Sequence, residues 1–223
     1  MPLALRSLLL AGSTGLVGRA LLAQALAGPD LQAVHLLLRR AGAAPSADAR
    51  VRPLVVDFAA LPALPAADAA LCALGTTIKV AGSQAAFRAV DHDAVLAFAR
   101  AARDAGVTRF GLVSALGADA RSRVFYNRVK GEAEDAMRAL GFATLVIARP
   151  SLLLGDRQAL GQPTRRGERL GQHLAAPLAP LLPAAWRPIG ADAVARALLR
   201  ALAGAGAGVQ VLESARLHEL GAP

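Results

Sequence analysis

The 223-residue chain contains a single cysteine, Cys72, so it can form neither an internal disulfide nor a zinc cluster built on several cysteines. Cys72 lies in the apolar stretch Ala-Ala-Leu-Cys-Ala-Leu, which is typical of a buried strand. No metal site is predicted from the remaining residues. The absence of a cysteine framework leaves a packed hydrophobic core as the source of stability.

Lysine is almost as rare, since all but two of the 25 basic residues are arginines and the lysines are Lys79 and Lys130. The formal net charge of +9 would suit a nucleic-acid-binding protein. However, the arginines are scattered along the chain rather than clustered. We therefore expect no specific nucleic-acid partner, and only weak adventitious binding at low salt.

The chain also lacks an apolar run long enough for a bilayer. The most apolar late segment, residues 174–186, is too short and is interrupted by Pro177, Pro180 and Pro183. The apolar run Leu8 to Ala11 is too short for a signal peptide and leads directly into a glycine-rich loop. We therefore predict no membrane span and a cytoplasmic location.

Hydrophobic residues make up 55% of the chain and charged residues 18%, which allows one domain with a large core. Short apolar runs predict strands at 5–11, 33–38, 51–56, 67–73, 110–113, 143–148 and 209–212. Helical patterns occupy 14–27, 84–105, 124–140 and 191–203. This alternation predicts a single α/β domain, residues 1–223, with a doubly wound parallel sheet, the Rossmann fold. Residues 155–190, rich in Gly, Pro and Arg, are predicted to form a small substrate-side lobe or lid.

A glycine-rich loop connects the first strand to the first helix. Its glycines are Gly12, Gly15 and Gly18, in the spacing G-x-x-G-x-x-G. The first glycine allows the tight turn, and the others allow close approach to a pyrophosphate and to the strand. The helix that follows directs free N–H groups and the positive end of its dipole at the phosphates. The loop therefore predicts a dinucleotide site.

Arg39 and Arg40 end the second strand, where NAD-specific enzymes place an acidic residue. A carboxylate there binds the ribose diol, whereas guanidinium groups neutralise a 2′-phosphate. The two arginines therefore favour NADP(H) over NAD(H), unless they are simply solvated. Asp57 ends the third strand on the same rim and either contacts the adenine amino group or caps a turn.

Tyr126 and Lys130 lie four residues apart, and hence on one helix face. An ammonium near a phenol stabilises the phenolate, so that the phenol can exchange a proton with an alcohol or carbonyl. Ser114 ends the fifth strand and is predicted to bind the substrate oxygen and stabilise charge developing on it. Tyr126 is the only tyrosine of the chain, which makes a chance Tyr–Lys pairing less frequent. Glu132, Glu134 and Asp135 are expected to form a solvated face paired with arginines.

Several stretches together resemble short-chain dehydrogenases/reductases of the atypical, extended-like kind, and most closely the Tat-interacting-protein group. They span the chain from residue 5 to about residue 200. The stretches are Gly12–Gly18, Leu74–Thr77, Val90–Asp93, Val113–Ala118, Ser122–Glu132 and Arg149–Gly155. One position departs from the pattern. Asp91 stands where many extended members carry an asparagine, which puts the usual water-linked proton relay in doubt.

The resemblance implies an NADP(H) site and a catalytic serine, tyrosine and lysine at Ser114, Tyr126 and Lys130. The implied cofactor-binding residues are Gly12, Ser13, Thr14, Gly15, Leu16, Val17, Gly18, Arg39, Arg40, Leu74, Gly75, Thr76, Tyr126, Lys130, Pro150, Ser151, Leu152 and Leu153. Pro150 to Leu153 are expected to wrap the nicotinamide end.

Two functions follow as hypotheses. The first is an NADP(H)-dependent oxidoreductase that acts on a small carbonyl or alcohol substrate, with Tyr126 as the proton donor or acceptor. The alternative is an NADP(H)-binding regulatory or scaffolding protein with little turnover and with protein partners. The sequence does not fix the oligomeric state or the substrate.

Overall fold

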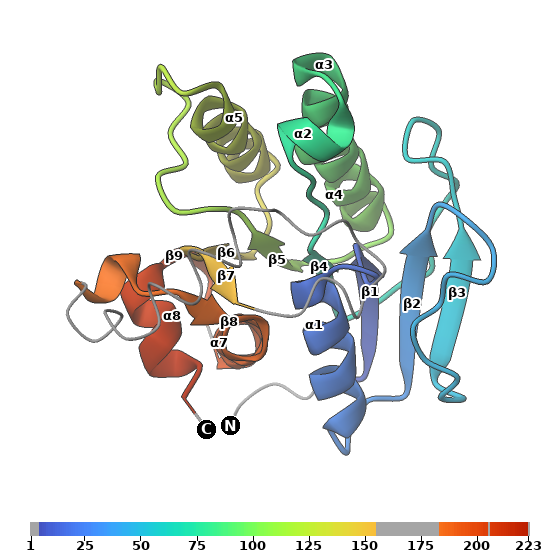
Figure 1. Ribbon diagram of the computed structural model, residues 1–223. Coiled ribbons are helices and arrows are strands. Elements are labelled where there is room, and N and C mark those ends of the chain that lie inside the picture. Colours follow the sequence, from blue (N-terminus) through green and yellow to red (C-terminus); the bar gives the residue numbers. More distant parts are fainter. Residues whose placement is uncertain (1–4, 155–182, 205, 223) are drawn as a thin grey trace.

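A computed structural model describes residues 5–154, 183–204 and 206–222 of the chain (Figure 1). Its centre is a seven-stranded sheet in the order β3-β2-β1-β4-β5-β6-β9, in which every neighbouring pair is parallel. The strands are β1 Ser7–Ala11, β2 Ala33–Leu38, β3 Val51–Val55, β4 Ala69–Cys72, β5 Arg109–Val113, β6 Thr144–Arg149 and β9 Gly208–Glu213. The predicted Rossmann fold is confirmed.

Helices cover both faces of this sheet (Figure 1). The helices are α1 Leu16–Ala27, α2 Ile78–Ala81, α3 Gln84–Arg88, α4 Val95–Asp104, α5 Phe125–Ala139, α7 Ala191–Gly204 and α8 Ser214–Leu220, with the π-helix η1 Ala89–Ala94 and the 3₁₀ helix η3 Ala184–Trp186. Alternate residues of β1 enter opposite layers, because side chains of a strand alternate between its two faces. Leu8 and Leu10 pack with α1 and α7, while Leu9 and Ala11 pack with α4 and α5.

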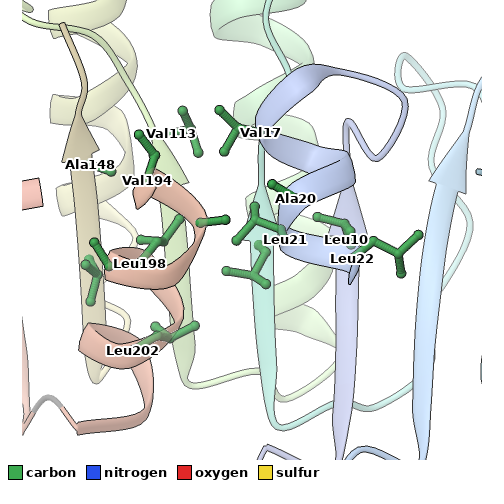
Figure 2. Close-up of a cluster of buried hydrophobic side chains, with 14 of the residues drawn as sticks. Leu10, Val17, Ala20, Leu21, Leu22, Val113, Ala148, Val194, Leu198 and Leu202 are labelled. Atoms are coloured by element: carbon green, nitrogen blue, oxygen red, sulfur yellow. The ribbon is translucent and has the colours of Figure 1, made fainter. Parts of the chain in front are cut away.

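The layer under α1 and α7 is a continuous apolar contact (Figure 2). Leu21 of α1 and Leu198 of α7 are fully buried, and they point into the same cluster as Leu10 of β1. Burying aliphatic side chains of this size stabilises the fold by about 1.5–3 kcal/mol each. This packing fixes the start of α1, and therefore the loop before it, against the sheet.

Some elements differ from the sequence expectation. The helix predicted at residues 84–105 is interrupted by the π-helix η1, which carries one extra residue per turn. The elements α2, α8 and the short parallel pair β7 Leu153–Leu154 with β8 Ile189–Gly190 were not predicted. The predicted lobe at 155–190 lies outside the described residues except for 183–190, which form η3 and β8.

Candidate functional site

The carboxyl ends of five parallel strands bring most of the predicted segments to one edge. Ala11, the last residue of β1, is opposite Leu37 of β2 on one side and Cys72 of β4 on the other. The chain passes outward from β1 in both directions, so the crevice between β1 and β4 is a topological switch point. The glycine loop therefore leaves the sheet between the segment after β2 and the segment after β4.

The glycine loop has no room for side chains at two of its positions. Gly12 has φ +86°, and a Cβ there would lie 2.4 Å from the backbone carbonyl of Ala73. A Cβ on Gly18 would lie 2.0 Å from the carbonyl oxygen of Gly12. Gly15 is different, because its Cβ would come no closer than 3.5 Å to the protein. The first and third glycines thus close the turn, as the sequence pattern predicts.

The N-terminus of α1 is open to an anion. Gly15 is the N-cap and provides no side chain to cap the helix, and no acidic residue occupies the first turn. Free N–H groups and the helix dipole therefore point outward at the switch point. The hydroxyl of Ser13, which is fully buried in the loop, has no hydrogen-bond partner within the described residues. A pyrophosphate matches the chemistry of this helix start and of the close backbone approach at the turn.

Arg39 and Arg40 follow β2 directly and are exposed. In the part of the chain that the structure describes, neither guanidinium forms a hydrogen bond or ion pair. Since Leu37 is level with the end of β1, both arginines leave the sheet beside the glycine loop. Asp57 caps a turn, because its Oδ1 accepts a hydrogen bond of 2.9 Å from the backbone N–H of Ala59. Its predicted contact with the adenine amino group stays a prediction.

The loop after β4 connects the glycine turn to the predicted Tyr–Lys pair. Ala73 and Leu74 contact Gly12 at its crowded position. Two residues on, a Cβ on Gly75 would lie 3.4 Å from Oδ1 of Asp91 and 3.6 Å from Nζ of Lys130. Leu74, Gly75 and Thr76 thus form a short bridge between the dinucleotide turn and the two charged side chains.

Lys130 and Asp91 form a buried ion pair. Their Nζ–Oδ1 distance is 2.7 Å, and their side chains are 7% and 0% exposed. The other carboxylate oxygen of Asp91 accepts a hydrogen bond of 2.9 Å from the backbone N–H of Thr76. Burial by itself lowers the pKa of Lys130, but the charge of Asp91, with a contribution from Tyr126, raises it above the ordinary lysine value.

Tyr126 lies one turn before Lys130 on α5 and is half-buried. Its ring packs against Phe87 of α3, with centroids 5.3 Å apart and planes tilted by 40°. The helix is pressed against the preceding loop, because a Cβ on Gly131 would lie 2.1 Å from the backbone nitrogen of Ala120. This close packing, together with Phe87, holds the Tyr126 ring one helical turn before Lys130.

Ser114 follows β5 as predicted, and its hydroxyl has a partner within the protein. Its Oγ donates a hydrogen bond of 2.6 Å to Oε1 of Glu134, and the serine is 7% exposed. A hydroxyl has one proton to donate. In this structure that proton is used by Glu134, so donation to a substrate oxygen would require the hydroxyl to turn, and the role of Ser114 stays a prediction.

The expectation that Glu134 lies on a solvated face is wrong, because its side chain is fully buried. Arg149 donates from Nε to Oε1 at 2.9 Å and from Nη2 to Oε2 at 2.7 Å, and Arg138 adds a bond of 3.1 Å. The hydrogen bonds that Arg149 donates to Glu134 raise the pKa of this guanidinium. This bidentate arrangement explains how a carboxylate is retained in the core.

The segment after β6 lies beside Ser114, as the parallel register requires. The N–H of Leu116 donates 2.9 Å to the carbonyl oxygen of Pro150. The hydroxyl of Ser151 donates to the carbonyl oxygen of Arg187. Leu152 is 41% exposed, while Leu153 is half-buried in β7. Their predicted contact with a nicotinamide remains a prediction.

Sequence reasoning missed the partners of these residues. The sequence did carry a signal that Glu134 is buried. The apolar residues Val129, Ala133 and Met137 mark the buried side of α5. Glu134 follows Lys130 by four residues and therefore lies on the same side of the helix as that lysine. Asp91 was noted as a departure from a family pattern, but not as the ion-pair partner of Lys130. Among the described residues, no group of three or more His, Cys, Asp or Glu side chains could hold a metal ion.

The fold and this edge of the sheet define a dinucleotide-binding protein of the Rossmann type. Residues 12–175 match the NAD(P)H-binding family. The chain belongs to that family, which supports a nicotinamide cofactor.

Two named relatives narrow the family assignment of the chain. Protein HTATIP2 of Rattus norvegicus is 35% identical over 225 residues, covering 97% of this chain and 89% of that protein. Protein fmp52, mitochondrial, of Aspergillus fumigatus is 35% identical over 200 residues, covering 86% and 85%. The predicted kinship with atypical short-chain dehydrogenases/reductases of the Tat-interacting-protein group is confirmed.

Solved structures share the fold. An oxidoreductase of the short-chain dehydrogenase/reductase family from Burkholderia thailandensis has a TM-score of 0.71 at 18% identity, over 96% of this chain and 93% of that chain. MoeE5 in complex with UDP-glucose and NAD has a TM-score of 0.67 at 17% identity, over 92% and 75%. At these identities the likeness supports the fold alone.

The comparisons contradict the predicted cytoplasmic location, because several fungal relatives are named as mitochondrial proteins. The prediction was wrong because the length of an apolar run bears on membrane insertion and does not indicate the compartment in which a protein lies. In the three described stretches of the chain, no helix is long and apolar enough to span a membrane.

Proposed function

We propose that the protein is an NADP(H)-dependent oxidoreductase that acts on a small carbonyl or alcohol substrate. One observation carries the proposal: the loop after β4 contacts Gly12 at one end and the Lys130–Asp91 pair at the other. A nucleotide bound at the glycine turn and extending along this loop would therefore bring its reactive end to the side chains of α5.

Different segments of the chain would bind different parts of the cofactor. The loop from Gly12 to Gly18 would receive the pyrophosphate on the free N–H groups of α1, and the segment from Leu74 to Thr76 would run along the nucleotide. Residues 150–153, after β6, would lie at its nicotinamide end. When bound, the nicotinamide supplies or takes up a hydride.

Proton exchange is assigned to Tyr126. Its phenol gives a proton to a carbonyl oxygen, or takes one from an alcohol, with Lys130 one helical turn away to stabilise the charge that results. Lys130 has three N–H donors, and within the described residues its one partner is Asp91. The remaining donors are available to the nicotinamide ribose.

Cofactor choice is assigned to Arg39 and Arg40, whose exposed guanidinium groups have no partner in the described parts of the chain. The double change Arg39→Ala/Arg40→Ala should weaken NADPH binding about tenfold or more and leave NADH binding unchanged, because only NADPH carries the 2′-phosphate. Titration of cofactor fluorescence would measure both affinities. The control Arg52→Ala/Arg100→Ala removes two exposed arginines away from this edge and should change neither. Equal affinities for the two cofactors in the wild type would defeat the assignment.

Turnover tests the role of the phenol. Tyr126→Phe should lower kcat by about 10²–10⁴-fold on any carbonyl that the wild type reduces, because general acid–base catalysis contributes that range. The affinity for NADPH should stay within about threefold, since the ring remains packed on Phe87. A panel of aldehydes and ketones with NADPH consumption as the readout provides the substrate.

One observation favours the alternative function. The hydroxyl of Ser114 is committed to Glu134, so the donor set expected around a substrate oxygen is incomplete. A protein that binds NADP(H) and signals through partner proteins would not need that donor. The alternative is supported if NADPH binds tightly, the carbonyl panel gives no turnover, and Tyr126→Phe changes no measured property.

A further inference from the structure

The ammonium next to Tyr126 is neutralised by a carboxylate from another element. Asp91 approaches Lys130 to 2.7 Å, and both side chains are almost completely buried. A backbone N–H of the loop after β4 donates to the second oxygen of Asp91. The carboxylate is therefore held on two sides, and the pair as a whole has no net charge.

The backbone around Asp91 is built for this contact. Asp91 lies in the π-helix η1, between the α-helical segments α3 and α4. Single π-turns inside helices are rare and occur often at functional sites. The side chain of Asp91 leaves this π-turn toward α5 and meets Lys130 there.

Within the described residues, few other ionisable groups act on the pair. Cys72 contributes from β4, and burial raises the pKa of its thiol to about 12, so it is uncharged well above neutral pH. Tyr126 contributes from α5, and Phe87, an apolar group of α3, packs on its ring. Burial alone would lower the pKa of Lys130, but the charge and hydrogen bond of Asp91, together with smaller effects of Tyr126 and Cys72, raise it overall.

We propose that Asp91 is a positioning residue that holds Lys130 and offsets its charge, so that the Lys130–Asp91 pair, rather than the ammonium alone, acts on the ionisation of Tyr126. The proposal rests on the proposed function and adds a residue to it. A free ammonium one helical turn from the phenol would favour the phenolate. Asp91 opposes that effect, so its removal should favour the phenolate.

The reaction that the proposed function assigns to this site is balanced. A bound reduced nicotinamide would supply a hydride to the carbonyl carbon. The carbonyl oxygen would take the phenol proton of Tyr126, and the phenolate that remains would recover a proton from water. Asp91 would exchange no atom in this sequence.

The only tyrosine of the chain reports on the proposal directly. Phenolate absorbance of the cofactor-free protein, measured against pH, follows the ionisation of Tyr126 without substrate or turnover. In Asp91→Asn the midpoint of this absorbance should move to lower pH by about one unit or more, because Lys130 loses its counter-charge. In Lys130→Met it should move to higher pH, because Asp91 is then unopposed.

The double variant Asp91→Asn/Lys130→Met removes both charges and should return the midpoint close to that of the wild type. Loss of packing alone would move all three variants in one direction, whereas cancellation of charge predicts opposite shifts and a return. Asp93→Asn is the matched control, since Asp93 lies on the same π-helix, is 61% exposed at its side chain, and pairs with His92. It should leave the midpoint unchanged.

Circular dichroism at each pH confirms that the measured protein is folded. If Asp91→Asn does not fold, the comparison of the double variant with Lys130→Met gives the same test, with the double variant expected at lower pH. An unchanged or higher midpoint in Asp91→Asn, or equal midpoints in that pair, would overturn the proposal. Failure of the carbonyl panel would instead count against the proposed function, because this titration requires no turnover.

Discussion

Helix α5 buries two charged side chains one turn apart, and their surroundings differ. Glu134 receives hydrogen bonds from Ser114, from Arg138 and from both Nε and Nη2 of Arg149. Among the described residues, Lys130 has a single carboxylate partner, Asp91, and lies beside the exposed loop residue Gly75. The carboxylate of Glu134 thus accepts four hydrogen bonds, whereas the other N–H groups of Lys130 have no partner in those residues.

This difference separates two clusters. The Glu134 cluster is structural, and the Lys130–Asp91 pair is the one to which the proposed function assigns chemistry. The bonds of Glu134 join α5 to the ends of β5 and β6, and Arg149 continues to Glu213 at the end of β9 at 2.8 Å. The Glu134 cluster therefore fastens the sheet edge on which the site is built. The Lys130–Asp91 pair instead lies against Gly75, in the loop after β4 that also contacts the glycine turn. Burial of a charge alone therefore does not identify a functional residue.

The largest effect should come from the structural cluster. Glu134→Leu should lower the free energy of unfolding by about 3 kcal/mol, because removal of one partner leaves the others desolvated and unpaired. The value lies at the low end of that range because Arg149 is 21% exposed and keeps Glu213. Asp135→Asn is the control on the same helix. Its side chain is 64% exposed, and the change should cost about 0.5 kcal/mol or less. Urea denaturation measures both.

The Lys130 pair should respond to pH in a definite direction. Lys130→Met should cost about 2 kcal/mol near neutral pH, less than the loss of Glu134, because Asp91 keeps its hydrogen bond from the N–H of Thr76. The pKa of Lys130 is raised in the folded state, so its contribution is complete below the ordinary lysine value of 10.5 and is lost as the pH rises through the folded value. The gap in unfolding free energy between wild type and variant should therefore narrow only above about pH 10.5. A gap that is constant to higher pH would show that packing, not charge, accounts for the loss.

The smallest effect is expected from a change at Ser114, and it tests to which of the two clusters this residue belongs. Ser114→Ala should cost about 1 kcal/mol of stability, the net worth of one hydrogen bond. Turnover on a substrate of the wild type should change by about threefold or less, because the hydroxyl proton is used by Glu134. A loss of about 10²-fold or more in kcat would assign Ser114 to the chemical cluster, since that is the cost of removing a donor to an oxyanion.

Much of the scaffold was predictable because its signals are local. Apolar runs that end in glycine or serine gave the strands β1 and β5, and the order of motifs placed Gly12, Arg39 and Ser114 at one edge. Parallel strands require this arrangement, since their carboxyl ends share one side of the sheet. No side-chain contact had to be known.

The partner of each site residue was not predictable in the same way. The hydrogen bond between Ser114 and Glu134, and the ion pair between Asp91 and Lys130, join residues from different elements. Their geometry depends on the register of α5 against the sheet, and on a π-turn that helix propensity does not indicate. The turn cap at Asp57 was one of two roles that the sequence left equal, and it became visible only in the backbone geometry.

The π-helix η1 also allows the position of Asp91 to change without a change in the ends of the helical stretch that contains it. The helical stretch that contains it begins at Ser83, whose hydroxyl caps α3, and gives way to Gly106 in the left-handed conformation after α4. Deletion of a single residue between 89 and 94 would leave both boundaries intact and let the three pieces fuse into one ordinary α-helix. The same deletion would rotate the acidic side chain out of line with the amine. A lineage could thus gain or discard the counter-ion by a one-codon insertion or deletion, without rebuilding the domain around it.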